Sequence, residues 1–205
     1  MTENNNNTEK EILDAAERLF LKKGFALTST TEIAKEVGCN QALVHYYYRT
    51  KEKLFTGIFE KKTLLFLSDF ISGSRKDLPF EEKIKGLIEA HFNMLLKNQQ
   101  LPFFLFTELI LNEKRLDVLK KNLSDNYGEV YRKFDDELKS EIAKGNIRQM
   151  TFMDILFTIV SLNGMVFMIN PIIKKTLICD ENEYREFIDK RRNENIRIVM
   201  LSIKP

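Results

Sequence analysis

The sequence is poor in the residues that metal sites and covalent catalysts need. Among its 205 residues there are two cysteines, Cys39 and Cys179, and two histidines, His45 and His91. No CxxC or Cys/His spacing is present, which argues against a zinc site. Glycine-rich phosphate loops, GxSxG and HExxH are also missing, so the sequence predicts no enzyme and no bound cofactor or metal. Two isolated thiols are typical of a reducing cytoplasm.

A strong excess of positive charge is missing as well. The net charge is only +2, so overall charge gives no indication of nucleic acid. The opening MTENNNNTEKE has no apolar segment, and we expect no signal peptide. Ile155–Ile173 carry no charge, but Asn163, Asn170 and Pro171 interrupt the stretch. We interpret it as a buried or interface helix and expect no membrane partner.

The pattern that is present is helical. Apolar residues recur at helical spacing and no strand-like alternation occurs, which predicts an all-α fold of about nine helices. Thr8 and Glu11 form a capping-box pattern, which predicts the start of the first helix at Thr8. Gly24 is its predicted end. The segment Ile71–Pro79 is the best boundary. We therefore expect an N-terminal domain over residues 8–70 and a larger helical domain over residues 71–205.

Ser29–Lys53 has the pattern of a helix-turn-helix, with the motif itself at about residues 29–48. Ser29, Thr30 or Thr31 can cap a short helix that Gly38 ends, and Asn40 can cap a second one. Such a motif places its second helix in the major groove of DNA. No acidic residue lies between positions 36 and 52, so the second helix has no charge that would repel phosphates.

Ten residues in and beside this motif are candidates for DNA contacts. Lys51 lies in the first turn of a helix, where a cation adds to the anion-binding N–H groups. Gln41 can pair with adenine in bidentate fashion, and Ala42 or Leu43 can pack on a thymine methyl group. The full set is Thr30, Thr31, Asn40, Gln41, Ala42, Leu43, His45, Tyr46, Tyr47 and Lys51.

Structural explanations stay open for several of these residues. Asn40 is a helix cap whether or not it also faces DNA. His45 and Lys51 are also of the types found on ordinary solvated surfaces. Among the three successive tyrosines, Tyr48 is the one that we expect in the core. For Cys39 we expect packing rather than redox sensing.

Three ordered segments in the first third of the chain resemble one protein family. They are TTEIAKEVG at residues 30–38, VHYYY at 44–48 and RTKEKLF at 49–55. Their order and spacing are similar to those of the TetR family of bacterial transcriptional repressors. The resemblance implies a three-helix DNA-binding domain followed by a larger helical domain for ligand binding and dimerisation. At Asn40, Gln41 and Ala42 the sequence differs from the residues that are usual in the family. These differences leave the expected fold unchanged, but they fall among the expected base contacts.

The resemblance also implies an effector pocket in the larger domain. The middle of the chain is rich in aromatic residues, and His91, Asn93 and Glu108 are the polar residues expected among them. Ordinary core packing is the alternative explanation for each residue. The candidate pocket residues are His91, Phe92, Phe103, Phe106, Glu108, Tyr127 and Tyr131. A small apolar or aromatic effector is expected.

Two helices carry apolar surface that a single core does not explain, which predicts a two-fold dimer. They are the helix near Ile155–Ile169 and the last helix, at about Glu183–Ser202. The candidate interface residues are Ile155, Ile159, Leu162, Met165, Val166, Ile169, Phe187, Ile188, Ile196 and Val199.

The combined prediction is a cytoplasmic homodimeric transcriptional regulator. It is expected to repress from a pseudo-palindromic operator in double-stranded DNA and to be released by its effector. The alternative is a membrane-associated or adaptor helical protein without sequence-specific DNA binding.

Overall fold

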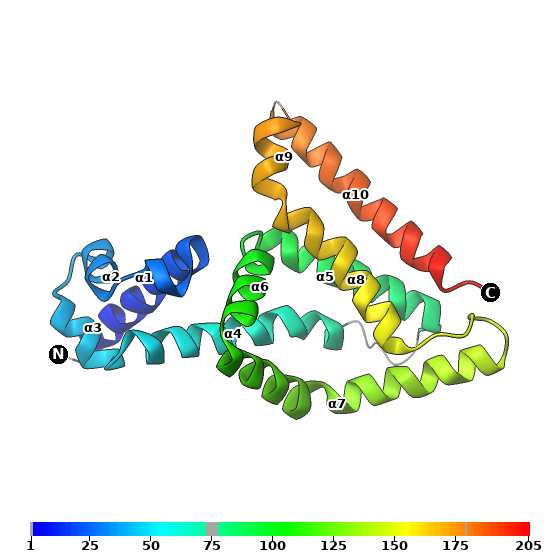
Figure 1. Ribbon diagram of the computed structural model, residues 1–205, viewed down its shortest axis with the longest axis horizontal. Coiled ribbons are helices and arrows are strands. Elements are labelled where there is room, and N and C mark those ends of the chain that lie inside the picture. Colours follow the sequence, from blue (N-terminus) through cyan, green and yellow to red (C-terminus); the bar gives the residue numbers. More distant parts are fainter. Residues whose placement is uncertain (1, 73–77, 179) are drawn as a thin grey trace. The chain divides into compact units, whose positions relative to one another are not determined.

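A computed structural model describes residues 2–72, 78–178 and 180–205. These ranges contain ten helices and no strand, which confirms the predicted all-α class (Figure 1). The helices are α1 (Thr2–Leu27), α2 (Thr30–Val37), α3 (Gln41–Tyr48), α4 (Lys51–Ser72), α5 (Phe80–Lys97), α6 (Leu101–Leu111), α7 (Glu113–Ala143), α8 (Phe152–Met168), α9 (Asn170–Thr176) and α10 (Glu181–Ser202).

The chain forms two compact units. The first comprises Met1–Leu64 and Phe103–Lys120, and the second comprises Leu65–Pro102 and Lys121–Pro205. Most of α6 and the start of α7 therefore pack with the N-terminal helices. The domain division at residue 70 stays a prediction. Residues 73–77 of the predicted boundary segment, and Cys179, lie outside the described residues.

The first helix begins earlier than predicted. Because α1 starts at Thr2, the predicted cap at Thr8 is wrong. Asn7 Nδ2 instead donates to Glu11 Oε1 at 2.8 Å, one turn further along the helix. The helical backbone is interrupted at Gly24, where φ is 78° and ψ is 175°. Glycine enters this region without the clash that a Cβ would cause, and the predicted break at this residue is confirmed.

Side-chain caps set the starts of the next three helices, and those of α2 and α3 are at predicted residues. Ser29 Oγ accepts a hydrogen bond from the backbone N–H three residues on, at 3.1 Å. Asn40 Oδ1 accepts from the N–H two residues on, at 2.9 Å, and Thr50 Oγ1 from the N–H three residues on, at 3.1 Å. Each such cap stabilises its helix by about 1 kcal/mol. Gly38 ends α2 with φ at 77°.

An apolar core holds the first unit together. Ile33 of α2 and Val44 of α3 are buried, and the rings of Phe20 and Phe55 meet edge to face with 4.9 Å between centroids. Each large buried side chain contributes about 1.5–3 kcal/mol by leaving water. The buried apolar residues of this unit are Ile12, Ala15, Ala16, Leu19, Phe20, Ile33, Ala34, Val44, Leu54, Phe55, Ile58, Phe59, Phe104 and Leu105.

Phe25, directly after the break at Gly24, is held by charged groups from α6 and α7. Its backbone N–H donates to Glu108 Oε1 at 2.9 Å. The other carboxylate oxygen of Glu108 accepts from the guanidinium of Arg115, and both side chains are buried. The Arg115 Cζ lies 4.9 Å from the Phe25 ring centroid and 3.8 Å from that of Phe55. This ion pair therefore fixes the end of α1 that follows the break at Gly24.

In the second unit, α5, α8 and α10 pack against one another. The later part of α7 joins this core through Phe134, whose ring stacks on Phe152 with 4.9 Å between centroids. A capping box of Thr151 and Asp154 starts α8. The core residues are Phe80, Ile84, Leu87, Ile88, Phe134, Leu138, Ile147, Phe152, Ile155, Ile159, Val199 and Ile203.

Buried polar side chains connect the three packed helices. Asn163 Nδ2 donates to the carbonyl of Ile88 at 3.0 Å and lies 3.3 Å from His91 Nδ1. Asn195 Nδ2 donates to Asn163 Oδ1 at 2.9 Å, and Arg191 donates to Asn195 Oδ1 at 2.6 Å. Burial lowers the pKa of His91 from 6.5 to about 4, so the ring is neutral in the folded protein at pH 7.

Acid should destabilise the protein through His91. Between pH 6.5 and about 4 the unfolded chain binds a proton at this ring that the folded chain does not, so stability falls as pH falls through this window. The full effect is up to about 3 kcal/mol. Urea unfolding from pH 7 to pH 4.5 should show a smaller loss of stability for His91→Gln than for the unmodified protein. Equal losses would contradict this role.

Removing the cation beside Glu108 should also destabilise the fold. Arg115→Met leaves a buried carboxylate without its partner, which costs roughly 3–5 kcal/mol. Adding Glu108→Gln should restore part of the loss, because the amide oxygen still accepts from Phe25 N–H. Urea unfolding measures the stability of the single and the double variant. Lys133→Met, which removes the exposed ion pair with Glu129, is the control and should have little effect. An Arg115→Met protein as stable as that control would refute the role of the buried pair.

Candidate nucleic-acid interface

Helix α3 presents a polar and aromatic face to solvent. Gln41, Ala42, His45 and Tyr46 are exposed, and Leu43 is 38% exposed. Val44, between them in sequence, is buried and anchors the helix to the core. Hydrogen-bond donors and acceptors on a short helix without acidic side chains can approach the base edges of the major groove.

The other candidate residues of the motif lie around this face. Thr31 and Asn40 are exposed, and Thr30, Tyr47 and Lys51 are half-buried.

Tyr48, which the sequence predicts in the core, is half-buried and serves the fold through its hydroxyl. Its hydroxyl donates to the backbone carbonyl of Glu9 at 3.2 Å. Burial, followed by the charges of Glu9 and Asp14, raises the pKa of Tyr48 to about 12. The hydroxyl is therefore protonated at neutral pH and serves as a hydrogen-bond donor between α3 and α1.

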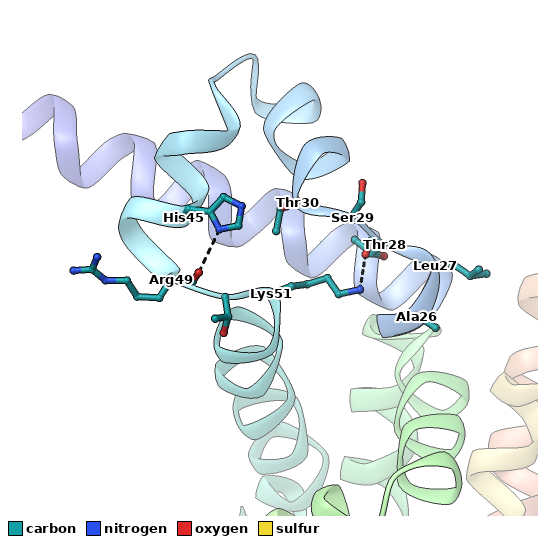
Figure 2. A pocket seen from close by; sticks show the side chains of 9 residues that line it. Ala26, Leu27, Thr28, Ser29, Thr30, His45, Arg49 and Lys51 are labelled. Atoms are coloured by element: carbon teal, nitrogen blue, oxygen red, sulfur yellow. Dashed lines mark hydrogen bonds between the residues drawn. The ribbon is translucent and has the colours of Figure 1, made fainter.

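Three polar side chains of α2 and α3 form a hydrogen-bonded chain on this surface. Gln41 Nε2 donates to Thr30 Oγ1 at 2.9 Å and lies 3.4 Å from His45 Nε2. His45 Nδ1 lies 3.2 Å from the carbonyl oxygen of Arg49 (Figure 2). Gln41 and His45 are thus oriented before any ligand arrives.

Arg49 makes the sharp turn from α3 to α4. Its backbone has a φ of 63° and a ψ of −54°, close to the rare γ-turn conformation, which costs a residue with a Cβ about 1–3 kcal/mol. Two hydrogen bonds offset this strain: Arg49 N–H donates to the carbonyl of His45 at 2.9 Å, and the carbonyl of Arg49 meets the His45 ring. The sequence pattern includes Arg49 in its third segment but does not indicate this role.

An open hollow of about 490 Å³ lies beside these residues, at the starts of α2 and α4. His45, Arg49 and Lys51 line it together with hydroxyl residues, and none of its lining residues is acidic (Figure 2). Its full lining is Ala26, Leu27, Thr28, Ser29, Thr30, His45, Arg49, Thr50 and Lys51. N–H groups, hydroxyls and cations in one hollow suit an anion such as a backbone phosphate.

Lys51 is partly occupied by the chain before α2. Its Nζ donates to the carbonyl of Thr28 at 2.9 Å (Figure 2). It also donates to the carbonyl of Phe25 at 3.0 Å and lies 4.1 Å from the centroid of the Phe25 ring. An ammonium group has three donors, so one remains for a phosphate. Lys51 therefore both positions the start of α2 and carries charge into the hollow.

The candidate effector residues are divided between the two compact units. His91, Phe92 and Tyr127 are buried in the second unit, where the Tyr131 ring packs 5.4 Å from that of Phe152. Phe103, Phe106 and Glu108 belong to the first unit.

The two groups also differ in burial. Phe103 is 60% exposed and Phe106 is 55% exposed, whereas the Glu108 carboxylate is already paired with Arg115. Asn93, the remaining polar residue expected near a pocket, is exposed on α5.

The candidate interface residues also fall into two groups. Ile155, Ile159, Val166, Ile188 and Val199 are buried within the second unit itself. Leu162, Phe187 and Ile196 are half-buried, whereas Met165 is 55% exposed and Ile169 is 37% exposed.

Further exposed apolar side chains flank the second group. They are Met153, Phe157, Ile172 and Leu201. Helical periodicity identifies such apolar helices in a sequence but does not separate the side chains that face the core from those that face solvent.

Comparison with known proteins matches the site to one family. A model of the bacterial regulatory proteins of the tetR family matches residues 12–58, which include α2, α3 and the start of α4. The fatty acid metabolism regulator protein of Bacillus subtilis (strain 168) is 24% identical over 111 residues, which are 54% of this chain and 56% of that protein. The chain spans about half or less of the first curated relatives that it matches.

Two further likenesses cover more of the chain. The HTH-type transcriptional regulator QacR of Staphylococcus aureus (strain Mu50) is 24% identical over 77% of this chain and 73% of that protein. The crystal structure of a tetR-family bacterial regulatory protein from Rhodococcus RHA1 has the same fold, with a TM-score of 0.67 over 96% of this chain and 97% of that chain, at 14% identity. With its helix-turn-helix, its helical fold and these relatives, the chain belongs to the TetR family of bacterial transcriptional regulators.

Proposed function

We propose that this regulator is a cytoplasmic homodimer that represses transcription by binding a pseudo-palindromic operator, and that a small apolar or aromatic effector releases it. The observation that carries the proposal is the exposed face of α3. Its base-contacting side chains stand on a helix that buried Val44 anchors, with no acidic residue from position 37 to position 51. A recognition helix needs this combination of rigid support and exposed hydrogen-bonding groups.

Phosphate binding falls to residues at the starts of α2 and α4. Thr30 and Thr31 lie in the first turn of α2 and Lys51 in that of α4, where free N–H groups and the helix dipole favour an anion. Arg49 lines the hollow together with Thr30 and Lys51 and adds a further cation, if it turns toward the DNA backbone. These contacts position α3 and carry no sequence information by themselves.

Base reading falls to the N-terminal part of α3. Gln41 offers hydrogen bonds, while Ala42 and Leu43 offer apolar contact to a thymine methyl group. Asn40 caps the helix and faces solvent beside them. His45, Tyr46 and Tyr47 follow one turn later, where they can reach the sugar-phosphate backbone at the edge of the groove.

The proposed dimer interface uses the exposed side of α8 together with α10. Met153, Phe157 and Met165 follow one another on α8 at intervals of four and then eight residues, so they form one row along the helix. Phe157 is 72% exposed, and Leu201 on α10 is 51% exposed. A two-fold dimer buries the same patch on both protomers, and an apolar row of this kind suits such a contact.

The proposed effector site lies in the second unit, near His91, Phe92, Tyr127 and Tyr131. The neutral ring of buried His91, which meets the Phe66 ring edge to face with 5.3 Å between centroids, favours an uncharged ligand over an anion. An effector releases the operator only if it binds the DNA-free arrangement of the dimer more tightly than the DNA-bound one.

Two other functions have less support. In the described ranges no single helix is long and apolar enough to cross a membrane; only α8 and α9 taken together, bent by 46°, reach the required length and composition. Asn163 in that pair is fully buried and hydrogen-bonded within the fold. An enzyme is not supported by the relatives, which are transcriptional regulators.

The proposal is tested by letting the purified full-length protein select fragments from its own genome, followed by comparison with Phe157→Glu. The unmodified protein should enrich sequences with two inverted half-sites, and its affinity should fall steeply with salt. Phe157→Glu should dissociate the dimer at least roughly 100-fold more readily, since an unpaired carboxylate from each protomer would be buried. It should lose operator binding in parallel.

Leu123→Glu on α7, where the side chain is 42% exposed, is the matched control and should keep both properties. Light scattering measures the assembly and circular dichroism checks that the helices remain. A Phe157→Glu protein that stays dimeric would refute this interface. A purified protein that enriches no sequence would refute the proposed function.

A further inference from the structure

The tautomer of His45 is determined by the turn that follows α3. Its Nδ1 lies 3.2 Å from the carbonyl oxygen of Arg49, and a carbonyl oxygen can only accept a hydrogen bond. Nδ1 therefore carries the hydrogen. In a neutral imidazole the other ring nitrogen, Nε2, must then be an acceptor. The backbone turn at Arg49 thus sets what His45 offers to its neighbour on the preceding turn of α3.

That neighbour is Gln41, whose amide nitrogen is used twice within the protein. Gln41 Nε2 donates one hydrogen to Thr30 Oγ1 at 2.9 Å, and its second hydrogen points to His45 Nε2 at 3.4 Å. The carbonyl oxygen Oε1 of Gln41 accepts no hydrogen bond from the residues that the structure describes, and the side chain is exposed. The free hydrogen-bonding group of Gln41 is therefore an acceptor.

The opposite orientation of the amide is disfavoured by His45. The Thr30 hydroxyl can donate or accept, so Thr30 alone would tolerate either orientation of Gln41. The His45 acceptor would face the Gln41 oxygen if the amide were turned, and two lone pairs would then oppose each other. His45 is the residue that selects the orientation, and it does so because the Arg49 carbonyl fixes its tautomer.

We propose that Gln41 reads its base through the side-chain oxygen alone and so selects a base with an exocyclic amino group, adenine or cytosine. In the major groove, adenine offers its N6 and cytosine its N4 as donors, whereas guanine and thymine offer acceptors at the corresponding positions. Bidentate pairing to adenine would need a Gln41 N–H for N7, and both hydrogens are already engaged. The inference rests on the proposed function, because it takes α3 as the reading helix.

The test uses the full-length protein and an operator that it selects from random-sequence DNA. The position read by Gln41 is the one whose base preference disappears in Gln41→Ala. If that base is adenine, replacing it with 7-deazaadenine removes N7 and should leave affinity within about twofold, whereas purine, which lacks N6, should weaken binding roughly tenfold. If it is cytosine, pyrimidin-2-one, which lacks N4, takes the place of purine. Gln41→Ala on the same DNA measures the loss that comes from the altered duplex itself.

Three outcomes would overturn the proposal. They are a preferred guanine or thymine at this position, a loss with 7-deazaadenine as large as that with purine, and no change of base preference in Gln41→Ala. Failure to select any sequence would refute the proposed function, and the inference with it. A protein that selects an operator but shows one of the three outcomes refutes the inference alone.

The positioning role of His45 has its own readout. His45→Phe keeps an aromatic ring but removes the acceptor, so the Gln41 amide can turn. Discrimination between adenine and guanine at the base pair that Gln41 reads should then fall by about fivefold or more. In the Gln41→Ala background the same substitution should leave that ratio unchanged. An unchanged ratio in His45→Phe alone, or an equal change in both backgrounds, would refute the role of His45.

Discussion

The placement of the DNA-binding helices depends on how Phe25 is held. Its N–H donates to Glu108, its carbonyl accepts from Lys51, and its ring lies beneath both Lys51 and Arg115. Gly24 allows the backbone to depart from helical geometry just before Phe25. The contacts with Glu108, Lys51 and Arg115 then fix the direction in which the chain continues to α2. Because α2 and α3 share a cap-defined turn, a shift at Phe25 would move both. Residues from α6 and α7 therefore belong to the structure that aims the reading helix.

The same residues show how charge is used in a chain that is almost neutral overall. Arg115 and Glu108 are buried and serve the fold, whereas Arg49 and Lys51 are among the residues that line an open hollow free of acidic side chains. His45 contributes by orientation, since its fixed tautomer aligns Gln41. This surface is distinguished by the local arrangement of its charges and not by the net charge of the chain. The buried hydrogen-bonded side chains around Asn163 have a separate role, which is to align the helices of the second unit.

Much of this could be predicted from sequence because the relevant signals are local. The caps at Ser29, Asn40 and Thr50 and the breaks at Gly24 and Gly38 depend on residues a few positions away. Arg115 shows no such signal, since its partners lie far from it in sequence. Leu27 is apolar, yet it is 76% exposed. Likewise, Ile155 and Phe157 look equivalent in sequence, and only the fold separates the buried side chain from the exposed one.

The central claim is that two copies of α3, held in one dimer, read two halves of an operator. Hydroxyl-radical footprinting of the full-length protein on a selected fragment tests this most directly. The account predicts two protected segments related by a dyad, on one face of the duplex, with centres about one helical turn (~34–36 Å) or somewhat more apart. A single protected segment, or protection without dyad symmetry, would contradict it.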